Sequence, residues 1–143
     1  MKQHTTCLAI ECTAHTFGIG IINSKGTILA DARRQVTTEK GGLIPNEVAN
    51  HHENVKEDVL KEALQQAKIG MDKIDLIAVS QGPGLPPSLH VGMRYVKKLA
   101  KDFNKPLVGV NHIVGHLEIG RLLTGAKDPV YLFVSGANTQ IIN

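Results

Sequence analysis

Short apolar runs come first in this chain, and segments with apolar residues at helical spacing follow them. Three such runs open the sequence, and Ser-Lys-Gly at 24–26, which suits a tight turn, separates the last two. We therefore expect a β-meander with strands at Thr6–Glu11, Phe17–Asn23 and Thr27–Ala32.

Apolar residues recur every three to four positions in three later segments, which predicts helices. The first helix begins at Asn46, a residue that suits an N-cap, and reaches about Lys68. One face of this helix should contain Val48, His52, Val55, Val59, Ala63 and Ala67. The other two helices are expected at Ser88–Phe103 and His112–Leu123.

Short apolar segments between and after the helices predict strands at Asp75–Ser80, Leu107–Val110 and Val130–Val134, and a last extended piece follows SGANT at 135–139. The element order is then βββαβαβα followed by a hairpin. This order predicts an α/β fold with a mixed sheet and helices on its faces, the ribonuclease-H-like arrangement.

The chain ends within the strand-like segment Ile-Ile-Asn, and an apolar strand without a neighbour is a liability at a sheet edge. We therefore expect residues 1–128 to form an N-terminal lobe and residues 129–143 to begin a second, truncated lobe.

Composition and charge exclude few classes of function. The 143 residues suit one domain, and the net charge of +3 permits contact with a polyanion without requiring it. No stretch approaches the roughly 20 apolar residues of a membrane span, and no signal peptide precedes the first strand, so we expect a cytoplasmic protein without membrane contact. Cys7 and Cys12 should point to opposite faces of the chain and form no disulfide.

A histidine pair in the third predicted helix has the spacing of metal ligands. His112 and His116 are four residues apart, so both imidazoles project from one face with Cβ atoms about 5–6 Å apart. Imidazole binds zinc and iron, but two ligands do not complete a site, so another must come from elsewhere. Solvated or capping histidines explain the pair as well.

Polar loops follow three predicted strands, and ligands of α/β folds collect at strand ends. The loop SQGPGLPPSL precedes a helix N-terminus that favours anions, although a rigid connection explains it equally well. The loop SGANTQ has small residues that let backbone amides approach a ligand, although an ordinary turn explains it nearly as well. Candidate cleft residues from the first and last loops are Glu11, Thr13, His15, Thr16 and Asn138.

A basic stripe along the second predicted helix offers contacts for RNA phosphates. A solvated helix face is the simpler interpretation. The stripe consists of Arg94, Lys97, Lys98, Lys101 and Lys105.

Five segments together resemble one known family: IECTAHTFGIGI, GGLIPNEVANHH, SQGPGLPPSLHVGMR, KPLVGVNHIVGHLEIGR and FVSGANTQ. In this order they are similar to the archaeal and eukaryotic tRNA N6-adenosine threonylcarbamoyltransferase, the catalytic subunit of the KEOPS complex. The resemblance runs through nearly the whole chain, whereas family members are more than twice as long. It implies a lobe of the actin-like ATPase superfamily. The implied activity is transfer of a threonylcarbamoyl group from threonylcarbamoyl adenylate to N6 of the adenosine beside the anticodon.

The resemblance also implies site residues and cofactors. His112 and His116 match the two metal-binding histidines of the family, whose ion is iron or zinc, and no side chain matches an evident general base. The family's first substrate loop, which contacts ATP or threonylcarbamoyl adenylate, matches Phe133, Val134, Ser135, Gly136 and Ala137. The family often has tyrosine at Phe133 and a second glycine at Ala137.

The implied partners are tRNA and other KEOPS subunits, namely a small dimeric subunit on the N-terminal lobe and a small kinase-like subunit; no DNA is expected. We expect this lobe to be inactive by itself. A noncatalytic partner-binding lobe is the main alternative. A metalloprotease is less well supported, because HIVGH lacks the glutamate of HExxH, and a sugar or acetate kinase rests on fold analogy alone.

Overall fold

The computed structural model describes residues 4–38, 41–135 and 138–142. It divides into two compact units, residues 1–112 and residues 113–143, and each is described by itself. The first unit contains β1 (Thr6–Glu11), β2 (Thr16–Asn23), β3 (Ile28–Gln35), α1 (Pro45–Ala67), the short 3-10 helix η1 (Met71–Lys73), β4 (Leu76–Gly82), α2 (Pro86–Asp102) and β5 (Leu107–Asn111).

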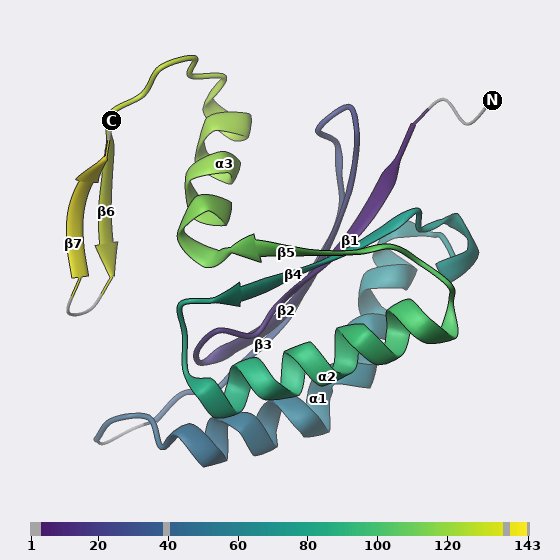
Figure 1. The fold of residues 1–143 in the computed structure, drawn as a ribbon, viewed down its shortest axis with the longest axis horizontal. Helices are drawn as coiled ribbons and strands as arrows, with labels where there is room; N and C mark the ends of the chain where they lie inside the picture. The colour runs from purple at the N-terminus through teal and green to yellow at the C-terminus, as the bar shows by residue number, and fades with distance from the viewer. Residues whose placement is uncertain (1–3, 39–40, 136–137, 143) are drawn as a thin grey trace. The chain divides into compact units, whose positions relative to one another are not determined.

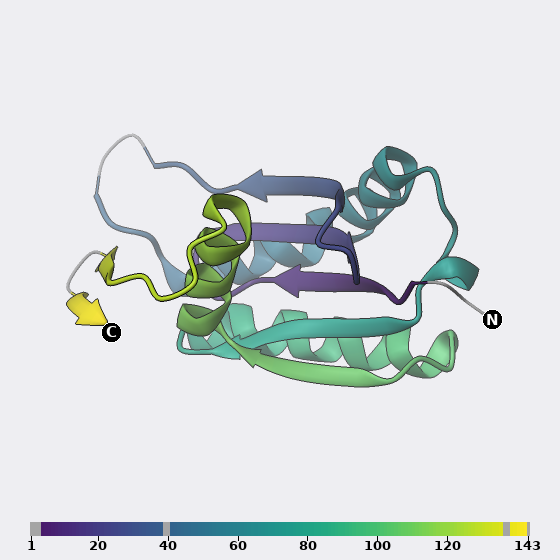
Figure 2. The same ribbon diagram turned by 90° about the horizontal axis from the view of Figure 1, so that it is seen from above.

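The first unit is built on a five-stranded sheet with the strand order β3-β2-β1-β4-β5 (Figure 2). The meander strands pair antiparallel, while β1 with β4 and β4 with β5 pair parallel. The register places Leu8 of β1 between Ile21 of β2 and Ile77 of β4. This mixed sheet confirms the predicted ribonuclease-H-like arrangement.

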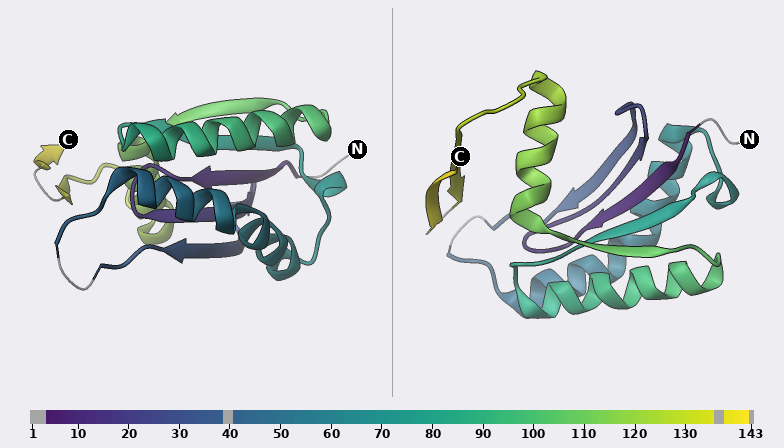
Figure 3. Two further views of the ribbon diagram at one scale, coloured as in Figure 1. Left: turned by 90° about the horizontal axis from the view of Figure 1, so that it is seen from below. Right: turned by 45° about the horizontal axis from the view of Figure 1, so that its top comes forward.

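Helices α1 and α2 lie side by side on one face of this sheet (Figures 1 and 3). Alternate strand residues point to that face, and the face of α1 that was predicted from helical spacing supplies Val48, His52, Val59 and Ala63 to the interior. Because tryptophan is absent, the core is mostly aliphatic, and Phe17 is its largest fully buried side chain. Within this unit both long helices therefore cover the same face of the sheet.

The starts of the two long helices correct the prediction. Helix α1 begins at Pro45, with Ile44 as an extended N-cap that makes no side-chain cap hydrogen bond, so Asn46 lies inside the first turn. Helix α2 begins in the same way at Pro86, two residues before the expected start. Proline suits the first helical turn because its missing N–H would have no partner there.

The second unit continues α3 (His112–Thr124), which begins at the last residue of the first unit, and adds β6 (Tyr131–Ser135) and β7 (Asn138–Ile142). The two strands form the predicted hairpin, with Ser135 opposite Asn138. Three of its apolar residues are exposed, Leu132 at 70%, Val134 at 66% and Ile141 at 77%. The expected lobe boundary after residue 128 concerns a longer protein and stays a prediction.

Two further expectations concern the chain as a whole. Cys7 and Cys12 are both free thiols, as predicted. Among the described residues, none of the helices has the length and apolar character needed to cross a membrane.

Candidate functional site

The carboxyl ends of the parallel strands meet at one edge of the sheet. Glu11 ends β1, Gly82 ends β4 and Asn111 ends β5, and Thr16 begins β2 beside them. The loop at residues 12–15 joins β1 to β2 at this edge, and α3 starts directly after β5. The fold therefore places polar residues that are about a hundred positions apart in sequence at one strand edge.

Three of the predicted site residues contact one another there. Glu11 Oε1 accepts hydrogen bonds from the backbone N–H of Thr13 at 2.7 Å and from its hydroxyl at 2.5 Å. Glu11 Oε2 lies 3.0 Å from Nδ1 of His112, and Thr13 Oγ1 lies 3.3 Å from the same nitrogen. The structure thus brings Glu11, Thr13 and His112 into one cluster.

The environment of Glu11 favours its ionised form. Burial by itself would raise the pKa of this carboxyl, but hydrogen bonds from Ser80 and Thr13 and the neighbouring His112 together lower it. Ser80 was not predicted as a site residue. The parallel pairing of Ile10 with Val79 sets Ser80 of β4 beside Glu11 of β1, a neighbour that sequence spacing does not show.

Contacts from two other segments hold the loop that carries Thr13. Nε2 of the fully buried His52, on α1, donates a hydrogen bond to the carbonyl of Ala14 at 2.8 Å. Just before α2, the backbone N–H of Leu85 donates to the carbonyl of Thr13 at 2.7 Å, and Gly84 lies directly against Thr13. These contacts fix where Thr13 meets Glu11.

The first residue of this loop, Cys12, carries a buried thiol. Cys12 is fully buried, and a Cβ atom added at Gly92 of α2 would stand 1.8 Å from its Sγ. Burial is the main cause that raises the pKa of Cys12 to about 12, so the thiol stays neutral and fills space rather than acting as a nucleophile.

The buried His52 predicts a pH dependence of stability. Burial lowers its pKa from the ordinary value of 6.5, and the nearby His51 and His15 add to this, while hydrogen bonding to Ala14 partly opposes it. As pH falls below 6.5, the unfolded chain binds a proton that the folded protein resists, so the free energy of unfolding should decrease.

Urea unfolding at pH values above and below 6.5 would measure this change in the free energy of unfolding. His52→Gln provides the comparison, because its amide can still donate to Ala14 but does not titrate. We expect the free energy of unfolding to depend less steeply on pH in this variant. An equally steep dependence in both proteins would show that His52 is not the group responsible.

The second unit contains the other predicted metal ligand. His116 of α3 lies against Phe133 of β6, with ring centroids 6.0 Å apart. Both line an open pocket of about 340 Å³ whose other walls are Leu117, Tyr131, Leu132, Val134 and Ser135. Gly136 and Ala137 lie outside the described residues, and only the backbone of Asn138 is described.

Among its described residues, the structure does not add a third metal ligand to the histidine pair. Within the described part of the chain, no three His, Cys, Asp or Glu side chains are grouped closely enough to hold an ion. Two further cleft candidates form backbone contacts at this end of the sheet: the carbonyl of His15 accepts from the N–H of Val36, and Thr16 pairs with Gln35.

The basic stripe lies on α2 except for Lys105, which follows the helix, and two of its members form ion pairs. Arg94 contacts Glu53 of α1 at 3.3 Å, and Lys98 contacts Asp102 at 2.6 Å. Exposed ion pairs of this kind suit a solvated helix face, which was the simpler interpretation.

Known proteins match both the sequence and the fold. The family model for tRNA N6-adenosine threonylcarbamoyltransferase matches residues 27–143. A protein of that name from Thermofilum pendens is 49% identical over 134 residues, covering 94% of this chain and 40% of the relative. A protein from Methanobrevibacter smithii, called a probable bifunctional tRNA threonylcarbamoyladenosine biosynthesis protein, is 47% identical over 137 residues, covering 96% of this chain and 26% of the relative.

A solved structure shares the fold. YeaZ from Pseudomonas aeruginosa matches with a TM-score of 0.66 at 14% identity, over 97% of this chain and 64% of that chain. At this identity the likeness concerns the fold alone. The chain spans about 40% of the length of the transferases that it matches. Because the family model extends over most of its residues, the chain belongs to the tRNA N6-adenosine threonylcarbamoyltransferase family.

Proposed function

We propose that this chain is the N-terminal lobe of an enzyme that transfers a threonylcarbamoyl group from threonylcarbamoyl adenylate to N6 of a tRNA adenosine. The observation that carries this proposal is the 49% identity to a transferase of that name over 94% of the chain. The lobe acts together with the part of the protein that corresponds to the other 60% or so of its relatives, and by itself it is inactive.

The proposed metal ligands in this lobe are His112 and His116 of α3, which follow each other by one helical turn. The donor chemistry fits zinc or iron, because both metals bind imidazole nitrogen. The hydrogen bonds at Nδ1 of His112 support this role, since a histidine ligand typically donates its other ring N–H to a carboxylate. Further ligands come from outside the described residues.

A bound metal ion would supply Lewis-acid polarisation of the acyl group. The chain's own contribution is to bind and orient the adenylate. The pocket beside His116 and Ser135 receives it, and the backbone amides of Ser135 and Gly136 stabilise the charge that develops as the adenylate leaves.

The proposed partners are tRNA, ATP or the adenylate, and the other subunits of a KEOPS complex, in the cytoplasm. The family resemblance supports these assignments. The exposed outer faces of α1 and α2 offer a surface for a small dimeric subunit, and binding of such a subunit is the function that would remain if the lobe did no chemistry.

A chimera tests the activity. Residues 1–143 would replace the matching segment of the Thermofilum pendens relative, and incorporation of labelled threonine into tRNA would be measured with threonylcarbamoyl adenylate supplied. We expect transfer by the chimera and none by the relative without its N-terminal segment. A folded chimera that binds tRNA but transfers nothing would contradict the proposal and favour a noncatalytic lobe.

A further inference from the structure

Glu11 has a position from which it can hold another side chain. It is the last residue of β1, and the alternation along that strand turns its side chain away from the face that α1 and α2 cover. Its neighbours on the sheet are Ser80 of β4 and the start of α3 at His112. The side chain of Glu11 is 35% exposed and that of His112 is 23% exposed, so both are half-buried where they meet.

The two carboxylate oxygens of Glu11 have different partners. Oε1 accepts both the backbone N–H and the hydroxyl of Thr13, which fixes the rotation of the carboxylate. Oε2 is then directed at Nδ1 of His112, at 3.0 Å. The loop that carries Thr13 is itself held by His52 and Leu85, so the direction of Oε2 is determined by the fold.

This arrangement selects one form of the His112 ring. An ionised carboxylate only accepts hydrogen bonds, so Nδ1 of His112 must carry the proton. The Thr13 hydroxyl, whose hydrogen is used by Glu11, can also only accept from that nitrogen. In the neutral ring the lone pair therefore lies on Nε2, the nitrogen that points away from Glu11.

We propose that Glu11 is a positioning residue that fixes the Nδ1–H tautomer and the orientation of His112, so that His112 presents Nε2 to the metal ion. This inference rests on the proposed metal role of His112. It assigns to Glu11 a function that neither the histidine spacing nor the loop motif indicates, because 101 positions separate the two residues.

The tautomer can be measured without any metal. In the 143-residue chain, ¹⁵N NMR of the imidazole should show a protonated Nδ1 and an unprotonated Nε2 for His112. Glu11→Ala should abolish this preference, and Glu11→Gln should keep it in part. The glutamine carbonyl can accept from His112, but its NH₂ group then faces the backbone N–H of Thr13. An Nε2–H tautomer in the unsubstituted chain, or an unchanged tautomer in Glu11→Ala, would overturn the proposal.

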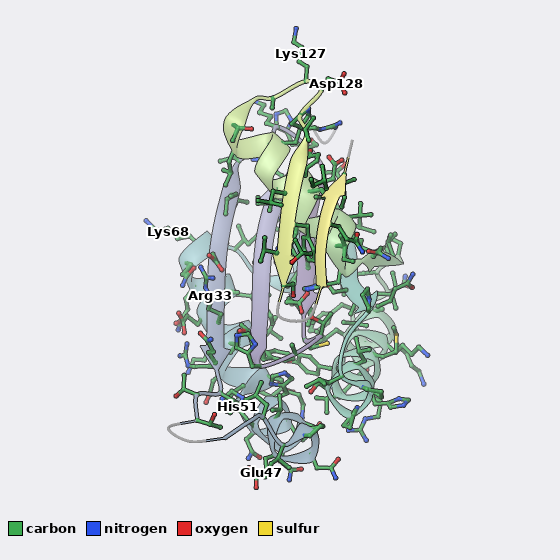
Figure 4. The ribbon with its side chains drawn as sticks, turned by 90° about the vertical axis from the view of Figure 1, so that its left-hand side faces the viewer. Arg33, Glu47, His51, Lys68, Lys127 and Asp128 are labelled. Atoms are coloured by element: carbon green, nitrogen blue, oxygen red, sulfur yellow. The ribbon has the colours of Figure 1, made fainter. Side chains whose placement is uncertain are left out.

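Metal affinity is the second readout. Zn²⁺ binding to the chimera, followed by competition with a chromogenic chelator, should weaken about 10–100-fold in Glu11→Ala and less in Glu11→Gln. Glu47→Ala is the matched control, because Glu47 is an exposed carboxylate in the first turn of α1 (Figure 4). Circular dichroism would establish that each variant is folded.

The variant His112→Ala distinguishes failure of the positioning role of Glu11 from failure of the metal role of His112. If His112→Ala loses Zn²⁺ while Glu11→Ala binds it normally, the positioning role is wrong and the metal role stands. If His112→Ala binds Zn²⁺ as tightly as the unsubstituted chimera, the metal role of His112 in the proposed function has failed, and the positioning role fails with it.

Discussion

Replacing His116 with alanine in the chimera should remove the bound metal ion and lower threonylcarbamoyl transfer by more than about 100-fold, the upper range for losing a residue that only supports a ligand. The reason is the small number of ligands that a zinc or iron site contains, of which α3 supplies two. His112→Ala should have a similar effect, and the double variant should be no worse than either single one, because the two histidines act as a unit.

Metal content and labelled-threonine transfer are the two measurements for these variants. Loss of the helix cannot explain the expected result, because alanine is a better helix former than histidine. His4→Ala is the control, since His4 precedes β1 and lies outside the site. A His116→Ala protein that loses transfer but keeps its metal would show that His116 acts on the substrate, through the pocket it shares with Phe133. A variant that keeps both would contradict the metal assignment.

Much of the fold was predictable because apolar residues recur at the period of each element. The first strand was predicted with its observed bounds, Thr6–Glu11, and the helical face of α1 was predicted with His52 on its inner side. The prediction ended β3 too early, at Ala32, because Arg33, Arg34 and Gln35 are polar. These residues extend the strand because Thr16 to Gly18 of β2 pair with them, and this pairing is a tertiary contact that no local pattern encodes.

The site was predictable only in its parts. Helical spacing placed His112 and His116 on one helix, and the loop motif pointed to Glu11 and Thr13. Spacing could not show that Glu11 contacts His112, because the contact depends on the order of three parallel strands. The hydrogen bond from His52 to Ala14 was missed for a similar reason, although a histidine in register with Val48 and Val59 on a buried face signals a buried polar partner.

Gly84→Ala should destabilise the chain by about 1–3 kcal/mol, the usual range for added atoms in a well-packed interior. A Cβ atom at this position would stand 2.4 Å from the carbonyl oxygen of Thr13, 2.7 Å from its Cβ and 2.9 Å from its Cα. Two of these atoms belong to the backbone, so rotation of a side chain cannot relieve the contact. Gly84 does not adopt the left-handed conformation of its neighbour Gly82, at φ 142°, so close approach is the cause of the effect.

The same substitution should disturb the metal site. The loop cannot shift freely, because His52 also holds Ala14 through a hydrogen bond. Movement of Thr13 would break its hydrogen bonds to Glu11 and thereby release Oε2 from His112. Hydrogen exchange at the Thr13 amide should therefore accelerate, and Zn²⁺ affinity of the chimera should fall toward that of Glu11→Ala.

Urea unfolding followed by circular dichroism measures the stability of Gly84→Ala, with Gly42→Ala as the matched control. A Cβ at Gly42 would meet nothing within 4 Å, so this variant should be as stable as the unsubstituted chain or slightly more stable. Equal stability of the two variants would show that the loop yields to the added methyl group. If stability falls but hydrogen exchange at the Thr13 amide is unchanged, the strain lies in the segment before α2. The proposed link from Gly84 through Thr13 to His112 would then be wrong.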